Sequence, residues 1–173
     1  MKVLAFAATS SRQSINKQLV SYAATLVPNA TVEVLDLNDY EMPIYSSDRE
    51  AESGIPAAAQ QFFSKIGEAD AVFVSFAEHN GSYTAAYKNI FDWASRINQK
   101  VFQNKAMVLM ATSPGPGGAQ SVLGSAVGSA PFFAADVKGS LSVPSFYDNF
   151  DVEKGELRNA ELIEKLQAIV AKL

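Results

Sequence analysis

Residues 106–111, Ala106-Met107-Val108-Leu109-Met110-Ala111, are six consecutive apolar residues, and the polar, glycine-rich run Thr112 to Ala119 follows them at once. A short apolar run without alternation is typical of a strand that is covered on both faces, as in a parallel sheet. Four further runs share this character: Val3 to Ala7, Val32 to Leu35, Ala71 to Val74 and, more weakly, Val137 to Val143. We therefore predict five strands, each buried on both faces.

Helical periodicity fills the gaps between these runs. Apolar residues recur there at spacings of three and four residues, which indicates one buried face of a helix. The segments with this spacing are 15–26, 58–66, 87–94, 119–130 and 162–173. Each gap between strands is long enough for one crossover helix. The alternation predicts a single doubly wound α/β domain over residues 1–173.

The connection from Asn38 to Gly54 interrupts this alternation. It contains five acidic residues, a proline and a Ser-Ser pair, and its apolar residues follow no period. A connection of this length is usually functional or mobile. A surface excursion between a strand and a helix is the alternative that we weigh equally.

The composition excludes several functional classes. The 173 residues include 14 Lys plus Arg and 18 Asp plus Glu, for a net charge of −4, with one histidine and no cysteine. These counts exclude a thiol nucleophile, a disulfide scaffold and metal sites built on cysteines or several histidines, so we expect no metal. No two basic residues are adjacent, which argues against a nucleic-acid partner. No apolar stretch reaches 18 residues, so we expect a cytoplasmic protein without a membrane partner.

Ligands of an open parallel sheet bind beyond the carboxyl ends of its strands, so the loops after the first, third and fourth strands are the candidates. The first, residues 8–16, carries four hydroxyls, one arginine and two amides at the start of a helix. Unpaired N–H groups at a helix start, joined by hydroxyl donors, predict a phosphate site. We assign to this site Thr9, Ser11, Arg12, Ser14, Ile15 and Asn16. A Ser14 N-cap in an ordinary polar turn is the alternative.

The second loop contains the Asn-Gly pair and the only histidine. Asn80 and Gly81 permit positive φ, so the backbone N–H and C=O groups of this loop can form hydrogen bonds with the edge of a flat ligand. We assign to the ligand site Ala77, Glu78, His79, Asn80, Gly81 and Ser82. For His79 we favour a place in the wall of the site over catalysis, with a solvated turn residue as the alternative.

The third loop has three glycines and two prolines within residues 114–118. Such a loop is locally stiff and can lie against a planar ring. Its predicted site residues are Ser113, Pro114, Gly115, Gly117 and Gly118. A strand-to-helix turn that needs special φ values is the alternative, which accounts for one or two of the glycines.

No side chain stands out as catalytic. Nothing in the sequence places His79 beside a serine nucleophile, and the strand ends lack the acidic cluster that holds Mg²⁺ in phosphoacceptor domains. A Walker motif and Gly-x-Gly-x-x-Gly are both absent, which argues against a P-loop NTPase and the usual dinucleotide fold. The chemistry is therefore expected to come from a bound cofactor, and the three loops suit a flavin.

Taken together, these loops resemble those of the NADPH-dependent FMN reductase family, a flavodoxin-like group that includes quinone, azo-dye and chromate reductases. The matching positions are Thr9, Ser14 and Asn16, then Asn80-Gly81-Ser82 with Tyr87-Lys88-Asn89-Ile90-Phe91-Asp92-Trp93, and Ser113-Pro114-Gly115-Pro116-Gly117-Gly118. Four positions depart from the family's pattern: Ala8 replaces Gly, Ser11 replaces Arg with Arg12 one place later, Ala77 replaces Pro and His79 replaces Tyr.

The resemblance implies a flavodoxin-like sheet with strand order 2-1-3-4-5. It implies FMN, with the phosphate on residues 9–16 and the isoalloxazine on residues 77–82 and 113–118. It further implies NAD(P)H as hydride donor, a quinone, free flavin or similar small electron acceptor, and a homodimer or homotetramer. For Lys88, Asn89, Asp92 and Trp93 we favour helix packing or a dimer contact. A flavodoxin-like electron carrier or an FMN-dependent regulatory module is the main alternative, and a binding domain without flavin is a third.

Overall fold

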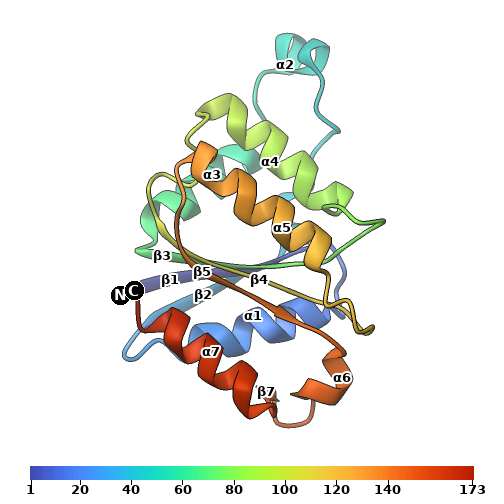
Figure 1. Cartoon of the computed structure of the whole chain (residues 1–173). Helices are drawn as coiled ribbons and strands as arrows, with labels where there is room; N and C mark the ends of the chain where they lie inside the picture. The colour runs from blue at the N-terminus through green and yellow to red at the C-terminus, as the bar shows by residue number, and fades with distance from the viewer.

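A five-stranded parallel sheet forms the centre of the computed structural model, which describes residues 1–173 (Figure 1). Its strands are β1 (Lys2–Ala8), β2 (Thr31–Leu35), β3 (Ala71–Phe76), β4 (Ala106–Thr112) and β5 (Asp136–Val143). Neighbouring strands pair in the order β2-β1-β3-β4-β5, all parallel. The predicted strands and the flavodoxin-like strand order are thus confirmed.

Helices cover both faces of the sheet (Figure 1). The long helices are α1 (Ile15–Thr25), α3 (Ala57–Glu68), α4 (Ala85–Ile97), α5 (Gln120–Ser129) and α7 (Ala160–Val170). They correspond to the five predicted helical segments. α1 and α7 lie on one face, and α3, α4 and α5 lie on the other. None of the helices has both the length and the apolar composition that a bilayer crossing requires.

Two apolar cores result, one on each face of the sheet. Successive strand residues point to opposite faces, so Phe6 packs with Phe62 of α3 while Ala5 belongs to the opposite core, which includes Leu19 of α1. The central strands β1, β3 and β4 are buried almost throughout. Their continuous apolar runs are explained by this cover on both faces.

The prediction that every strand is buried on both faces is wrong for the two edge strands, β5 and β2. In β5 only Leu141 and Val143 are buried. β2 is the more exposed of the two. Val32 is 36% exposed and Val34 is 40% exposed, and only Leu35 in this strand is buried. The strand order places β2 at an edge of the sheet, where the helical layers leave it open to solvent. An apolar run alone does not distinguish a central strand from an edge strand.

Several short elements were not predicted. They are the 3-10 helices η1 (Leu37–Tyr40) and η2 (Ala130–Phe133), the helices α2 (Ser47–Ser53) and α6 (Phe146–Asn149), and the hairpin strands β6 (Phe150–Asp151) and β7 (Glu156–Leu157). Their lengths of two to seven residues are too short to show a clear period.

The connection 38–54 forms an arm that ends in α2, which projects from the helical layer of α3 to α5 and buries no residue (Figure 1). The arm is fixed to α4 by Asn89. The Asn89 Oδ1 atom accepts from the Tyr45 N–H at 2.8 Å, and its Nδ2 group donates to the carbonyls of Met42 and Pro43 at 3.2 and 3.1 Å. The arm is therefore ordered against the body of the fold.

Trp93 provides the second anchor of this arm. Its Nε1–H donates to the Pro43 carbonyl at 2.7 Å. Its ring packs edge to face against the Tyr45 ring, with 4.9 Å between the ring centroids. Lys88 and Asp92 form an ion pair one turn apart on the same helix. The packing interpretation is confirmed for Asn89 and Trp93.

Replacing Asn89 with alanine tests this anchor. Asn89→Ala removes three hydrogen bonds, so the free energy of unfolding should fall by about 2–3 kcal/mol. Trypsin should cleave after the exposed Arg49 faster than in the unchanged protein. The control Lys88→Ala breaks only a surface ion pair and should cost less than about 1 kcal/mol. Unchanged stability and cleavage in Asn89→Ala would contradict the anchor.

Candidate functional site

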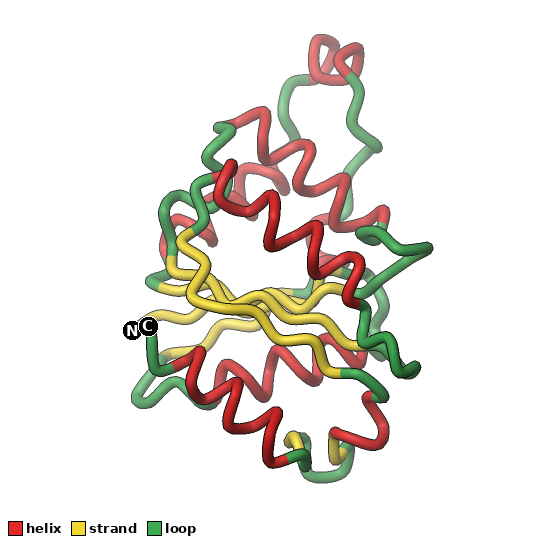
Figure 2. Tube along the Cα trace, in the orientation of Figure 1, coloured by secondary structure: helices red, strands yellow, loops and turns green.

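The loops after β1, β3 and β4 meet at the carboxyl edge of the sheet (Figure 2). They enclose a cavity of about 300 Å³. Ten predicted site residues line it: Thr9, Ser11, Ser14, Ile15, Asn16, Ala77, Glu78, His79, Ser113 and Pro114. The structure thus brings parts of all three predicted loops into one site.

Other predicted site residues lie outside the lining of this cavity. They are Arg12, Asn80, Gly81, Ser82, Gly115, Gly117 and Gly118. Three lining residues were not predicted: Gln13, Thr112 and Tyr147. Tyr147 lies on α6 and is 60% exposed. The signal that could have found it is its position after β5, because that strand also ends at this edge.

Asn16 ties the first loop to the ends of β3 and β4. Its side chain is 3% exposed, and its Oδ1 atom accepts from the Thr112 N–H at 3.1 Å and from the Ser75 hydroxyl at 2.7 Å. Its Nδ2 group donates to the Thr112 carbonyl at 3.3 Å. Asn16 therefore pairs with both backbone groups of Thr112 and fixes the distance between two walls of the cavity.

The first loop presents unpaired backbone donors. The N–H groups of residues 12–14, and those of Ile15 and Asn16 at the start of α1, have no acceptor within the protein. Ser14 is the N-cap of α1, because its hydroxyl accepts from the Lys17 N–H at 3.2 Å. The hydroxyl proton of Ser14 is still available. A run of such donors at a helix start is suited to an anion.

Neighbouring elements hold the first loop in place. The hydroxyl of Thr84, the N-cap of α4, donates to the Ala8 carbonyl at 2.9 Å. The Asn38 side chain donates to the Ser10 carbonyl at 3.0 Å. Asp36 accepts from Lys17 of α1 at 2.8 Å, and this bond, together with the Asn38 N–H, lowers the pKa of Asp36 to about 2. The bonds from Thr84 and Asn38 thus take up carbonyl oxygens of the first loop, while the N–H groups of residues 12–16 have no partner in the protein.

The second loop is a tight hairpin. The N–H of His79 donates to the Ser82 carbonyl at 2.9 Å, and the N–H of Ser82 donates to the His79 carbonyl at 3.1 Å. Asn80 and Gly81 between them have φ of +53° and +78°, as the Asn-Gly pair predicts. The His79 side chain is exposed and forms no ion pair or hydrogen bond, so the structure provides no base or nucleophile partner for it.

Glu78 caps α5 from the second loop. Its Oε2 atom accepts from the Val122 N–H in the first turn of that helix at 2.8 Å. The N-cap residue itself, Ala119, has φ of +56° and no side chain that could do this. The N–H groups of Gln120 and Val122 at the start of α5 are therefore paired within the protein, unlike those of Ile15 and Asn16 at the start of α1. This contact was not predicted, since it joins residues far apart in the sequence.

The third loop is held against the end of β5. The N–H groups of Ser145 and Phe146 donate to the carbonyls of Gly115 and Ser113 at 2.9 and 3.0 Å. Gly118 has φ of +60°, and a Cβ atom there would lie 2.3 Å from the Ser142 hydroxyl. Gly118 is thus required by the fold of the loop itself. Gly117 has ordinary φ and open space around it, so its predicted contact with a planar ring stays a prediction.

The site as a whole combines the donor-rich first loop with the cavity described above, whose lining includes His79 and Tyr147. No cluster of three or more histidine, aspartate or glutamate side chains converges to hold a metal ion. The fold and the position of this site define a flavodoxin-like class of protein.

The chain belongs to the NADPH-dependent FMN reductase family, whose family model matches residues 1–148. It is 32% identical over 117 residues to a 2-hydroxy-1,4-benzoquinone reductase of Burkholderia sp, over 66% of this chain and 62% of that relative. It is 30% identical over 113 residues to an NADPH:quinone oxidoreductase of Arabidopsis thaliana, over 65% of this chain and 56% of that relative. The chain therefore spans less than two thirds of the length of these relatives.

Among solved structures, the flavoenzyme NAD(P)H:(acceptor) oxidoreductase of Paracoccus denitrificans has the same fold. It superposes with a TM-score of 0.76 at 22% identity, over 99% of this chain and 93% of that chain.

Asn16→Ala should destabilise the protein far more than Ser14→Ala. The first change leaves Ser75 and both backbone groups of Thr112 without their buried partner, which should cost about 3–5 kcal/mol. The second removes one helix cap and should cost about 1 kcal/mol. Urea unfolding of both variants measures the difference. If Asn16→Ala lowers the free energy of unfolding by less than about 1 kcal/mol, Asn16 does not hold the strand ends together.

Adjacent glycines of the third loop should respond differently to alanine. Gly118→Ala forces a Cβ atom against Ser142 at positive φ and should cost about 2 kcal/mol or more. Gly117→Ala has open space and ordinary φ and should change the free energy of unfolding by less than about 1 kcal/mol. Thermal unfolding of the protein without added flavin checks both. Similar losses in the two variants would show that the loop has another conformation.

Proposed function

We propose that the chain binds FMN at the carboxyl edge of its sheet and is an NAD(P)H-dependent oxidoreductase that reduces a quinone, a free flavin or a similar small acceptor. The observation that carries this proposal is the run of unpaired N–H groups over residues 12–16, beside the hydroxyls of Thr9, Ser11 and Ser14. Membership of the FMN reductase family and the activities named for the relatives support the same function.

The donor set fits the phosphate of FMN. Backbone N–H groups at a helix start bind phosphate through charge-assisted hydrogen bonds, and the partial positive charge of the helix adds to them. The one carboxylate in the lining, Glu78, accepts the Val122 N–H and so is held by the start of α5. Arg12 belongs to the same loop, is exposed and raises the local positive charge. We assign the phosphate to Thr9, Ser11, Arg12, Ser14, Ile15 and Asn16.

The other two loops form the proposed seat of the isoalloxazine ring. It comprises residues 77–82 and 113–118, with Tyr147 as a further wall. FMN, when bound, supplies hydride acceptance from NAD(P)H and electron transfer to the acceptor. The N–H groups of Asn80 and Gly81 have no acceptor within the protein, so they can stabilise negative charge near the hairpin. The chain's own task is to bind and orient, and no side-chain acid or base is required.

The location and the oligomeric state that we propose are those that the family resemblance implies. We propose a cytoplasmic enzyme that works as a homodimer or homotetramer, without a nucleic-acid partner. Sedimentation of the purified protein, with and without FMN, tests the oligomeric state.

Preference for FMN over riboflavin tests the phosphate assignment. Hydrogen bonds to a charged group contribute about 1.5–3 kcal/mol each, so FMN should bind at least about tenfold more tightly than riboflavin. Ser14→Ala should reduce this ratio by about threefold or more, because it removes a donor that only the phosphate can use. The control Ser82→Ala, in the second loop, should leave the ratio unchanged.

Equal affinity for FMN and riboflavin would overturn the phosphate site. Steady-state oxidation of NAD(P)H with a quinone then separates an enzyme from an electron carrier. FMN binding without turnover would support the carrier, and colourless protein that binds no FMN would indicate a domain without flavin.

A further inference from the structure

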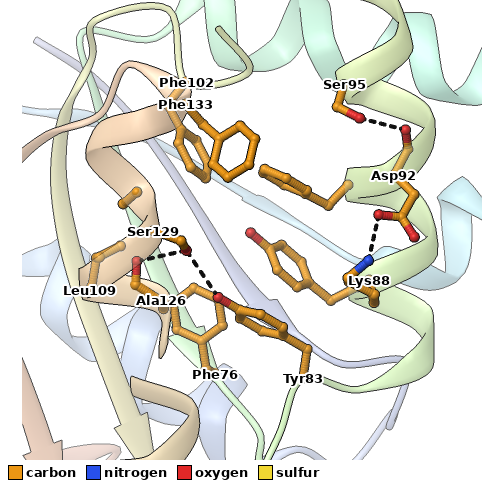
Figure 3. Close-up of a pocket in the computed structure, with 13 residues that line it drawn as sticks. Phe76, Tyr83, Lys88, Asp92, Ser95, Phe102, Leu109, Ala126, Ser129 and Phe133 are labelled. Atoms are coloured by element: carbon orange, nitrogen blue, oxygen red, sulfur yellow. Dashed lines mark hydrogen bonds and ion pairs between the residues drawn. The ribbon is translucent and has the colours of Figure 1, made fainter. Parts of the chain in front are cut away.

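A second cavity, of about 290 Å³, lies between α4 and α5, on the face of the sheet that α3, α4 and α5 cover (Figure 3). It shares no residue with the lining of the proposed FMN site. Side chains from both helices point into it, and Phe76 and Leu109 of the sheet form its floor. The proposed function makes no use of this cavity.

Aromatic rings form most of its wall and support one another. The ring of Phe91 packs edge to face on Phe133, with 4.7 Å between the ring centroids, and its centroid lies 5.9 Å from that of Tyr87. The Tyr87 and Phe76 centroids are 5.4 Å apart. Across from these rings, α5 contributes small residues such as Ala126. Closing the space would require these rings to give up their contacts with one another, which stabilise the wall.

One polar group on this wall has no partner. Tyr87 is 4% exposed, and its hydroxyl makes no hydrogen bond within the protein. No fully enclosed side-chain polar atom lacks a partner, so this hydroxyl must border the cavity. The neighbouring Tyr83 hydroxyl, by contrast, lies 3.4 Å from the Ser129 hydroxyl. Burial raises the pKa of Tyr87, so its hydroxyl stays protonated and can donate.

The lining of the cavity carries no unpaired charge, because its two charged side chains pair with each other. Lys88 and Asp92 of α4 pair at 2.6 Å, and the Ser95 hydroxyl donates to the Asp92 carbonyl at 2.8 Å (Figure 3). A charged ligand would lose its hydration among the rings without gaining a partner, which is costly. The cavity therefore selects for a neutral molecule.

We propose that the cavity between α4 and α5 binds a small neutral aromatic molecule with one oxygen that accepts a hydrogen bond from Tyr87, independently of FMN. A cavity of about 150 Å³ lined by apolar side chains is large enough for benzene, so about twice that volume suits a molecule of two fused rings. The aromatic wall favours a planar ligand, and the unpartnered hydroxyl fixes the place of its oxygen.

The probe for this site is 2-naphthol, titrated calorimetrically into the full chain with and without FMN. Binding should be saturable, with one molecule per chain, and equal in the two samples. Tyr87→Phe should weaken it about threefold to tenfold, the effect of one lost hydrogen bond. The same variant should keep its thermal stability, because the hydroxyl has no partner in the protein.

Ala126→Leu places three extra carbons in the cavity and should weaken naphthol binding at least tenfold while FMN affinity stays unchanged. The matched control is Ser125→Leu, which adds a leucine on the exposed face of the same helix and should bind naphthol normally. The proposal is overturned if wild-type protein shows no saturable binding, as when a second copy of the chain covers the mouth. It is equally overturned if FMN displaces naphthol or if Ala126→Leu and Tyr87→Phe bind it normally.

Discussion

The side-chain amide of Asn16 is the contact on which the rest of the site depends. It lies at the start of α1, yet its partners are the last backbone groups of β4 and the Ser75 hydroxyl in β3. All three bonds are buried, so breaking them would leave polar groups without water or partner. Because of this tie, the loop that carries the free donors and the loop that carries the glycines have a fixed separation.

The helices that start beside the cavity differ in what they offer a ligand. At α5, the Gly117 carbonyl and the Glu78 carboxylate take up the N–H groups of Gln120 and Val122. At α1, the Ser14 hydroxyl accepts the Lys17 N–H, and the N–H groups of Ile15 and Asn16 stay unpaired. The electrostatic attraction for an anion is thus concentrated at one end of the cavity, which gives the proposed cofactor a direction, with its phosphate at α1 and its ring toward the other loops.

The sequence predicts the layers of this fold well and its individual contacts less well. Five apolar runs and five periodic segments correspond to real strands and helices, since burial on a sheet or helix face sets the period of the sequence. Exposure of Val32 and Val34 was missed because edge and centre differ only in tertiary context. The same holds for Glu78, which caps a helix 44 residues away, and for Tyr147, whose short helix has no period. The strand ends and the loop composition located the three loops, and the resemblance implied the cofactor, while the roles of Asn16 and Gly118 required coordinates.

The central claim is that the carboxyl edge of the sheet, fixed by Asn16, is where FMN binds. A crystal structure of the protein grown with FMN tests it most directly. The account predicts density for the phosphate over residues 9–16, within hydrogen-bond distance of the N–H groups now unpaired, and for the ring against residues 77–82 and 113–118. Density for FMN at another surface, or a phosphate placed at the start of α5, would contradict it.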